Sequence, residues 1–300
     1  MPYKEADGKP SRDLINYNTV FGPDAREIEA QIDQTTRIRT LISKFEVEDI
    51  SWSDSHVKDV VDFLHTLDFV EHPEDRVIDP INQGAVAGDF GTDASFETRL
   101  LYHLRQQDHP QDHFTRIQDV AIANSEKSTS RDQLLTHLNR ELDSYGFEWN
   151  EQKVRMWVRL FSNLGVISYT NQEGIILSPS RGLLYEFLAL HADLEESNDL
   201  NDAFAWIEKN FIKVYRSRAG TPTVHIAVAQ VLENMEDDGV VEFRGMADAA
   251  NEVKLPATQS AGVESRLLKS YSVADKPSDR AAYALPMDRT DDPRIMGETT

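Results

Sequence analysis

Apolar residues recur along the first part of the chain with the spacing of amphipathic helices. Residues 25 to 45 and 57 to 67 carry apolar side chains every three or four positions. The second stretch follows Ser51-Trp52-Ser53-Asp54, which is typical of a helix N-cap, and it stops at Asp68. Residues 69 to 80 then form two short apolar runs around a polar turn, typical of strands. The pattern predicts helices followed by a β-hairpin.

The same order of elements occurs twice more. After helical periodicity at residues 96 to 107, 114 to 123 and 134 to 142, a helix begins at the cap Asn150, and Gly165 ends it before a hairpin at 166 to 177. Two amphipathic stretches, 183 to 194 and 203 to 214, precede a helix over 224 to 235. A strand at 240 to 243 follows, and we expect residues 252 to 255 to be its return strand.

Changes in composition suggest where these units begin and end. Residues 1 to 22 are polar and turn-rich, residues 82 to 95 are rich in glycine and polar residues, and apolar periodicity disappears from residue 272 onward. The predicted division is an N-terminal arm (1–22), a first unit (23–81), a linker (82–95), a helical segment with a second unit (96–181), a helical connector with a third unit (182–271) and a disordered tail (272–300).

Three helix-to-strand junctions share one pattern: an apolar helix end, a short acidic or glycine stop, and a β-branched strand. They are Leu-His-Thr-Leu-Asp-Phe-Val at 64–70, Leu-Phe-Ser-Asn-Leu-Gly-Val-Ile at 160–167 and Leu-Glu-Asn-Met-Glu-Asp-Asp-Gly-Val-Val at 232–241. These junctions resemble the winged-helix branch of the helix-turn-helix superfamily, and the resemblance covers most of the chain. It implies a mainly α fold with small β-hairpin wings (α+β), as three winged-helix-like units joined by helical connectors.

The resemblance also implies contact with double-stranded DNA, with one helix in the major groove and the wing on phosphate or in the minor groove. The second unit carries the most suitable side chains. Arg155 and Arg159 are four residues apart, so both can point toward one groove. The other expected DNA contacts of this unit are Gln152 and Lys153 near the helix start, Arg131 on the preceding helix, and Thr170, Asn171 and Gln172 in the wing.

The first and third units give weaker indications. In the third unit Arg216, Arg218, Arg244 and Lys254 suit contacts with the DNA backbone, although a packing module between domains is an equal alternative. In the first unit the acidic helix over 54 to 62 would repel phosphate, which favours dimerisation or contact with other proteins. For the second unit the alternative is a solvated face whose cations pair with carboxylates.

Charge complicates this interpretation. The chain has 31 Lys and Arg residues against 52 Asp and Glu residues, a net charge of −21, which ordinarily argues against binding a polyanion. However, the acidic residues are spread along the whole chain, arginine is about twice as frequent as lysine, and cysteine is absent. This composition is similar to that of cytoplasmic proteins from salt-accumulating halophiles of the archaeal type, whose carboxylate-rich surfaces stay hydrated in strong salt. The alternative is an acidic surface that imitates DNA or binds a basic partner.

Catalytic signals are weak. The absence of cysteine excludes disulfides and thiolate metal sites, and no phosphate-binding glycine loop or G-x-S-x-G motif occurs. His103, His109 and His113 are close in sequence, but Pro110 interrupts the helical spacing of a zinc site. Asp238 with Glu252-x-Lys254 matches the pattern of metal-dependent nucleases only formally. We therefore predict no catalytic residues, no metal ligands and no cofactor.

The combined prediction is a non-catalytic DNA-binding protein. It would act as a transcription regulator or as the DNA-binding subunit of a larger DNA-processing or defence complex, with homodimerisation or other protein subunits as further partners. The start of the chain carries no apolar leader, and no run of 18 apolar residues occurs, so we expect a cytoplasmic protein without a membrane partner. The alternative is a protein-protein scaffold subunit, and the minority alternative is a metal-dependent nuclease.

Overall fold

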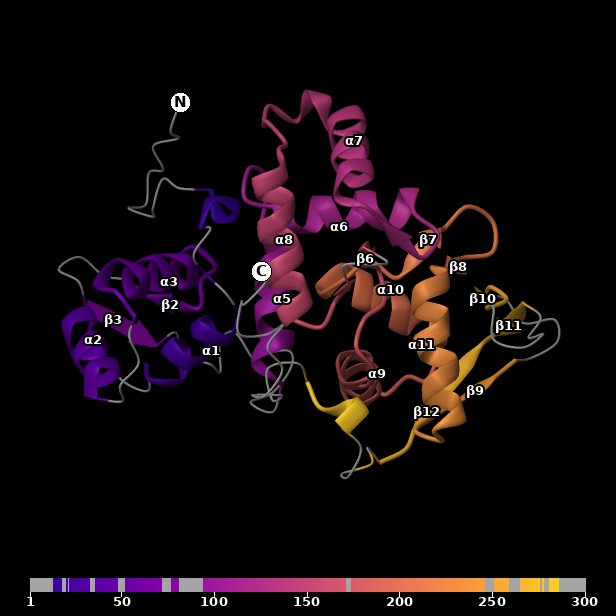
Figure 1. Ribbon diagram of the computed structural model, residues 1–300. Coiled ribbons are helices and arrows are strands. Elements are labelled where there is room, and N and C mark those ends of the chain that lie inside the picture. The colour runs from indigo at the N-terminus through magenta and orange to yellow at the C-terminus, as the bar shows by residue number, and fades with distance from the viewer. Residues whose placement is uncertain are drawn as a thin grey trace.

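The computed structural model describes residues 13–17, 20, 22–32, 36–47, 52–71, 77–80, 94–170, 174–245, 251–258, 265–275, 277 and 281–285. Within these residues, ten α-helices and a set of short strands form a mixed α+β fold in which helices predominate (Figure 1). The strands form small sheets of two to four members. At this level the predicted fold class is confirmed.

The first segment places two short strands on either side of a third. Its elements are α1 (Gly22–Ala30), β1 (Thr36–Arg37), α2 (Ile38–Val47), α3 (Asp54–Thr66), β2 (Val70–Glu71) and β3 (Val77–Pro80). β1 and β2 both pair antiparallel with β3, which lies between them. The predicted N-cap is confirmed, because Ser53 Oγ accepts a hydrogen bond from the backbone N–H of His56 at 3.2 Å.

The single helix predicted over residues 25 to 45 is wrong. α1 ends at Ala30, and β1 lies between it and α2. Ile32 and Ile38, on either side of this break, are each only 5% exposed. Because both side chains enter the core, the apolar spacing continues across the break and imitates one long helix.

The second segment repeats the order and the strand pairing of the first. After α5 (Phe96–Gln106) come α6 (His113–Asn124), β4 (Ser128–Thr129), α7 (Arg131–Glu141), the 3-10 helix η2 (Asp143–Tyr145), α8 (Glu151–Asn163), β5 (Ser168–Thr170) and β6 (Gly174–Ile176). β4 and β5 pair antiparallel with the central strand β6. Asn150 caps α8 as predicted, through a 3.1 Å hydrogen bond from the backbone N–H of Lys153. Gly165, in the left-handed region at φ 74°, follows the end of the helix.

The third segment pairs its strands differently. Its elements are α9 (Arg181–Glu195), α10 (Leu200–Asn210), β7 (Tyr215–Ser217), β8 (Thr223–Val224), α11 (Ile226–Asp237), β9 (Val241–Arg244), β10 (Val253–Leu255), β11 (Arg266–Leu268) and β12 (Ser270–Val273). The predicted return of residues 252–255 to β9 is wrong, because β9 pairs with β12. β10 instead pairs parallel with β8 and antiparallel with β11. Tyr271 of β12 favours the pairing of β9 with β12, because its buried hydroxyl donates a hydrogen bond to the Leu188 carbonyl in α9 at 3.1 Å and holds β12 in place.

Part of the predicted disordered tail is ordered. Ser272 and Val273 belong to β12, and a 3-10 helix, η3 (Ala281–Tyr283), follows. Tyr283 is fully buried, and its hydroxyl donates to Asp238 Oδ2 at 3.2 Å. A Cβ atom added to Gly182 would lie 2.5 Å from the Tyr283 carbonyl oxygen, so glycine permits this close approach. One aromatic anchor gives no periodic signal in the sequence, which is why the tail was expected to be disordered.

The predicted N-terminal arm is docked where the structure describes it. The 3-10 helix η1 (Leu14–Asn16) packs against α6 and α8. Leu14 and Ile15 are fully buried, and the backbone N–H of Leu14 donates to Gln111 Oε1 at 2.8 Å. Tyr17 makes an edge-to-face contact with Phe63 of α3, with ring centroids 5.9 Å apart. The arm therefore joins the first segment to the second.

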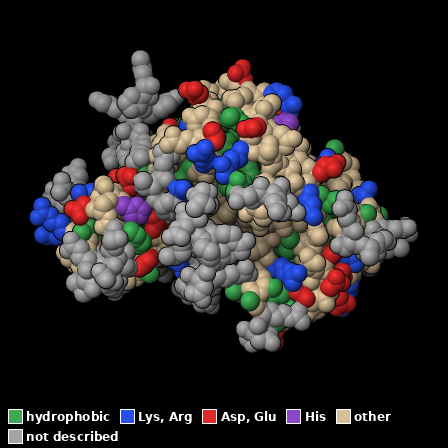
Figure 2. All heavy atoms as spheres, in the orientation of Figure 1, with side chains coloured by type: hydrophobic (Ala, Val, Ile, Leu, Met, Phe, Trp, Pro, Cys, Tyr) green, Lys and Arg blue, Asp and Glu red, His purple; other side chains and the backbone are tan. Residues whose placement is uncertain are grey.

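The three segments lie in sequence order across the molecule, with α1 to α3 at one side, α5 to α8 in the middle and α11 with its strands at the other side (Figure 1). On the face drawn in Figure 2, Lys and Arg atoms form small groups beside Asp and Glu atoms rather than one large field. No helix in the described part of the chain has the length and apolar character needed to cross a bilayer.

Candidate nucleic-acid interface

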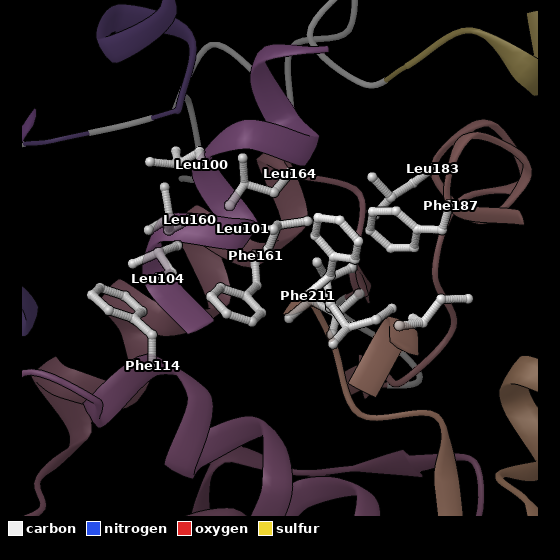
Figure 3. Close-up of a cluster of buried hydrophobic side chains, with 14 of the residues drawn as sticks. Leu100, Leu101, Leu104, Phe114, Leu160, Phe161, Leu164, Leu183, Phe187 and Phe211 are labelled. Atoms are coloured by element: carbon white, nitrogen blue, oxygen red, sulfur yellow. The ribbon is translucent and has the colours of Figure 1, made fainter. Parts of the chain in front are cut away.

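α8 is anchored from several directions, which fixes its orientation. Leu160, Phe161 and Leu164 of α8 meet leucines of α5, and Phe114 of α6 lies parallel to Phe161 with ring centroids 6.0 Å apart (Figure 3). Trp157 of α8 is fully buried. With this face in the core, the exposed residues of α8 are Glu151, Gln152 and Arg155, all in its first turns.

Arg155 is available to solvent and paired with its neighbour on the same helix. Its Nη2 atom lies 2.5 Å from Glu151 Oε1, and its Nε atom lies 3.1 Å from the same oxygen. The two side chains are 61% and 56% exposed. An exposed pair of this kind contributes about 0 to 1 kcal/mol. Arg155 can therefore exchange Glu151 for a phosphate or a base edge at little cost.

Arg159 is less open than Arg155, which argues against the predicted common groove contact of the two arginines. α1 and η1 pack against α8, and Arg159 is partly buried. Burial lowers the pKa of Arg159, and the nearby carboxylate of Asp24 in α1 acts in the opposite direction. Met156 and Asn163, on the same flank of α8, are each only 3% exposed. The sequence of α8 alone does not show which other element covers this flank.

Lys153 contacts two residues of the loop that leads into α8. Its ammonium group lies 3.6 Å from the centroid of the Phe147 ring and donates a hydrogen bond to the Glu148 carbonyl oxygen. Burial is the main cause that lowers the pKa of Lys153, while Glu148 and Asp13 raise it. These contacts hold the ammonium group against its own unit, and the DNA contact of Lys153 stays a prediction.

Arg131 connects the start of α7 to the hairpin. Its guanidinium carbon lies 4.7 Å from the centroid of the Tyr169 ring in β5, a cation–π geometry. Thr170 ends β5 next to this ring. Asn171 and Gln172, expected at the wing, lie outside the described residues. Gln152 is exposed at the start of α8. The described part of the predicted site thus retains Arg131, Gln152, Arg155 and Thr170.

The four predicted cations of the third segment lie on different elements. Arg218 is held by the mostly buried Glu208, with its Nη2 atom 2.7 Å from Oε2. Arg244 in β9 pairs with Glu242, with its Nη2 atom 3.1 Å from Oε2. Because β9 and β10 belong to different sheets, Arg244 and Lys254 do not form the predicted wing.

Arg216 and Lys254 are on the four-stranded sheet, and a further lysine lies near one of them. Arg216 and Lys254 are exposed on β7 and β10. Arg216 Nη1 lies 4.0 Å from Glu126 Oε1, and Lys127 next to Glu126 is also exposed. Sequence reasoning missed Lys127, because only the fold brings the turn after α6 beside β7. The only signal in the sequence is its place in a polar turn.

An aromatic cluster surrounds His113 beneath the start of α8. The ring of His113 lies 3.9 Å from Phe147, 5.8 Å from Tyr145 and 5.9 Å from Trp149, measured between centroids. His113 is fully buried, and neither ring nitrogen has a hydrogen-bond partner. Burial lowers its pKa to about 3, and the charge of Lys153 contributes in the same direction.

The residues considered for metal-dependent chemistry make other contacts. The ring of His103 packs against Phe69 at 4.6 Å, away from the aromatic cluster of His113. Asp238 Oδ2 accepts hydrogen bonds from Arg181 Nη1 at 2.7 Å and from the Tyr283 hydroxyl at 3.2 Å, so it ties α11 to α9 and η3. No group of three or more His, Asp or Glu residues in the described ranges is arranged to hold a metal ion.

Comparison of the chain with protein-family models, with curated proteins and with solved structures gave no match.

Proposed function

We propose that this chain is a non-catalytic, tandem winged-helix protein that binds double-stranded DNA. The observation that carries the proposal is the repeated order helix, strand, helix, helix, strand, strand in residues 22–80 and 113–176, with the last strand central in both small sheets. In a winged helix, the helix before the last two strands is the one that enters the major groove. In the second segment that helix is α8.

The proposed DNA surface is narrower than α8 as a whole. It consists of Gln152 and Arg155 on the first turns of α8, with Arg131 and Thr170 at the base of the hairpin. Arg155 and Gln152 would contact base edges or phosphates, and Arg131, held against Tyr169, would contact the backbone. Since Tyr169 already restricts the Arg131 side chain, less conformational entropy is lost when DNA binds.

Phosphate contacts from the third segment would extend this surface. Arg216 and Lys254 on the four-stranded sheet, with Lys127 near Arg216, are exposed cations suited to the backbone rather than to bases. They lie on elements different from α8, so their contribution would be additive to that of Arg155.

The net charge of −21 is compatible with DNA binding if the protein works in strong salt. In about 1 M salt the Debye length is roughly 3 Å, so distant carboxylates no longer repel DNA, although each phosphate contact also contributes less to affinity there. We propose a halophilic, cytoplasmic setting for this reason. Two roles fit this kind of binding: regulation of transcription, and DNA binding as a subunit of a larger DNA-processing or defence complex.

Measuring the affinity of the chain for duplex DNA tests the proposal. Binding of a fluorescently labelled duplex would be followed by anisotropy over a KCl series that extends to molar concentrations, for the wild type and for Arg155→Glu. We expect Arg155→Glu to weaken binding about tenfold or more and to reduce the salt slope by about one. Lys209→Glu is the matched control, because Lys209 is an exposed cation on α10 outside the proposed surface. Equal binding by the wild type and Arg155→Glu, or no binding at any KCl concentration, would refute the proposal.

A second candidate function is a protein-protein scaffold. The observation in its favour is that the flank of α8 with Met156, Arg159 and Asn163 is already covered by η1 and α1 of the same chain. If both α8 and α3 serve protein contacts in this way, DNA binding would be absent in the anisotropy assay, and a partner with a basic surface would be required.

A further inference from the structure

Two arginines of the first segment stand apart from the others. Each of the other arginines in the described ranges makes an ion pair, a ring contact or another polar contact. Arg37 and Arg39 make none with the described residues, and both are exposed. In a chain with 52 acidic against 31 basic side chains, carboxylate partners are abundant, so two unpartnered guanidinium groups this close in sequence are unexpected.

The fold directs both arginines outward at one place. Arg37 is the last residue of β1, and Arg39 is the second residue of α2. Ile38 between them is 5% exposed and enters the core, so the two arginines flank it on the outer side. Among the described strands, β1 is an edge strand of its sheet. Figure 2 shows Lys and Arg atoms at the outer end of the molecule, over the position that α2 occupies in Figure 1.

The local electrostatics favour an anion. The first turn of α2 contains no acidic residue, although acidic residues are the ones that the partial positive charge at a helix start stabilises. Arg39 in this turn is unfavourable by itself for the same reason. Backbone phosphates of a nucleic acid would supply partners for Arg37, for Arg39 and for the helix start, and guanidinium groups bind phosphate oxygens in a bidentate geometry.

The second segment has an arginine at the corresponding place. Arg131 in the first turn of α7 lies two residues after the end of β4, just as Arg39 in the first turn of α2 lies two residues after the end of β1. Both segments therefore present arginine at the start of the helix that follows the first strand. In the third segment the helix after β8 opens with His225 as its cap and Ile226 as its first residue, so this feature is absent there.

We propose that Arg37 and Arg39 form a second DNA contact, in which the first segment binds backbone phosphates of the same duplex that α8 reads. This inference rests on the proposed function and extends it to the segment whose acidic α3 argued against DNA. Exposed Asp54 on α3 would repel phosphate, so the contact is made by the start of α2 and the β1 edge. The first segment thus supplies affinity and orientation without reading the sequence.

The test is the salt dependence of DNA binding by the full chain with Arg37→Glu and Arg39→Glu together. We expect about tenfold or greater loss of affinity for a random-sequence duplex and a reduction of the salt slope by about 1.8, from about 0.9 per phosphate contact. The matched control is Lys58→Glu with Lys209→Glu, which changes the net charge equally at two other exposed lysines. Arg37→Lys with Arg39→Lys should keep the slope close to that of the wild type.

The outcomes separate this inference from the proposed function. If the wild type binds and Arg155→Glu weakens binding, but Arg37→Glu with Arg39→Glu binds as tightly as Lys58→Glu with Lys209→Glu, the second contact is wrong and the proposed function stands. If the wild type binds no DNA at any KCl concentration, both are wrong. Circular dichroism and thermal unfolding of each variant check that the fold is kept, which exposed positions should allow.

Discussion

Acid should destabilise this protein through His113, the buried histidine beneath the start of α8. Burial lowers the pKa of His113 from its ordinary value of about 6.5 to about 3. The folded pKa lies below the unfolded one, so the unfolded chain takes up the proton first as the pH falls. The free energy of unfolding therefore decreases as the pH drops from about 6.5 toward 3.

The size of this effect follows from the pH interval. At about pH 4.5 the solution is roughly 2 units below the unfolded pKa, and each unit corresponds to about 1.4 kcal/mol, so His113 alone costs about 2.7 kcal/mol. His103, whose pKa burial lowers to about 4, should contribute a similar but slightly smaller loss. Together these losses are a large part of the roughly 5 to 15 kcal/mol that stabilises a typical domain.

His113→Phe isolates the contribution of one ring. Both nitrogens of His113 lack partners, so phenylalanine leaves no polar group unsatisfied among Tyr145, Phe147 and Trp149. Urea unfolding at constant KCl would be measured at pH 7 and at pH 4.5 for the wild type, for His113→Phe and for the partly exposed His137→Phe as control. The loss of stability between the two pH values should be about 2.7 kcal/mol smaller in His113→Phe than in the wild type. An equal loss in both proteins would show that His113 is not held neutral by burial.

Three further predictions test the fold and its setting. Asp24→Asn should lower the free energy of unfolding by about 1 to 3 kcal/mol, because a carboxylate beside His56 and Arg159 is lost. The affinity for DNA should stay within about twofold of the wild type. If the affinity for DNA fell as much as in Arg155→Glu, Arg159 would be a DNA contact. Tyr283→Ala should cost about 3 to 5 kcal/mol in thermal unfolding, as for other buried aromatic side chains, and an unchanged melting temperature would contradict the docking of η3 on α9. Molar KCl should raise the melting temperature relative to low salt, because it screens the repulsion within a chain of net charge −21, and the same melting temperature in both would argue against a halophilic setting.

Local signals predicted the second segment well. The cap Asn150 and the terminating Gly165 define the ends of α8, and both work through contacts within a few residues. The hairpin after α8 was also predicted, and β5 and β6 pair antiparallel. Exposure of Gln152 and Arg155 followed from the helical period, because Trp157 and Phe161 define the opposite, buried face.

The errors arise where distant parts of the chain decide the outcome. The pairing of β9 with β12 depends on Tyr271 reaching α9, and no local pattern shows this. Arg159 was expected on the open face because its own helix permits it, but α1 covers that flank. Arg37 and Arg39 were overlooked for the opposite reason, since one long predicted helix hid the edge strand at which they lie.

Photo-crosslinking shows whether the start of α8 lies against DNA. A benzoylphenylalanine placed at position 152 would be irradiated with duplex DNA in molar KCl, and the same amino acid at position 209 of α10 would serve as the control. A covalent protein-DNA product is expected from position 152 and none from position 209. A product from both positions, or from neither while the protein remains folded, would contradict this expectation.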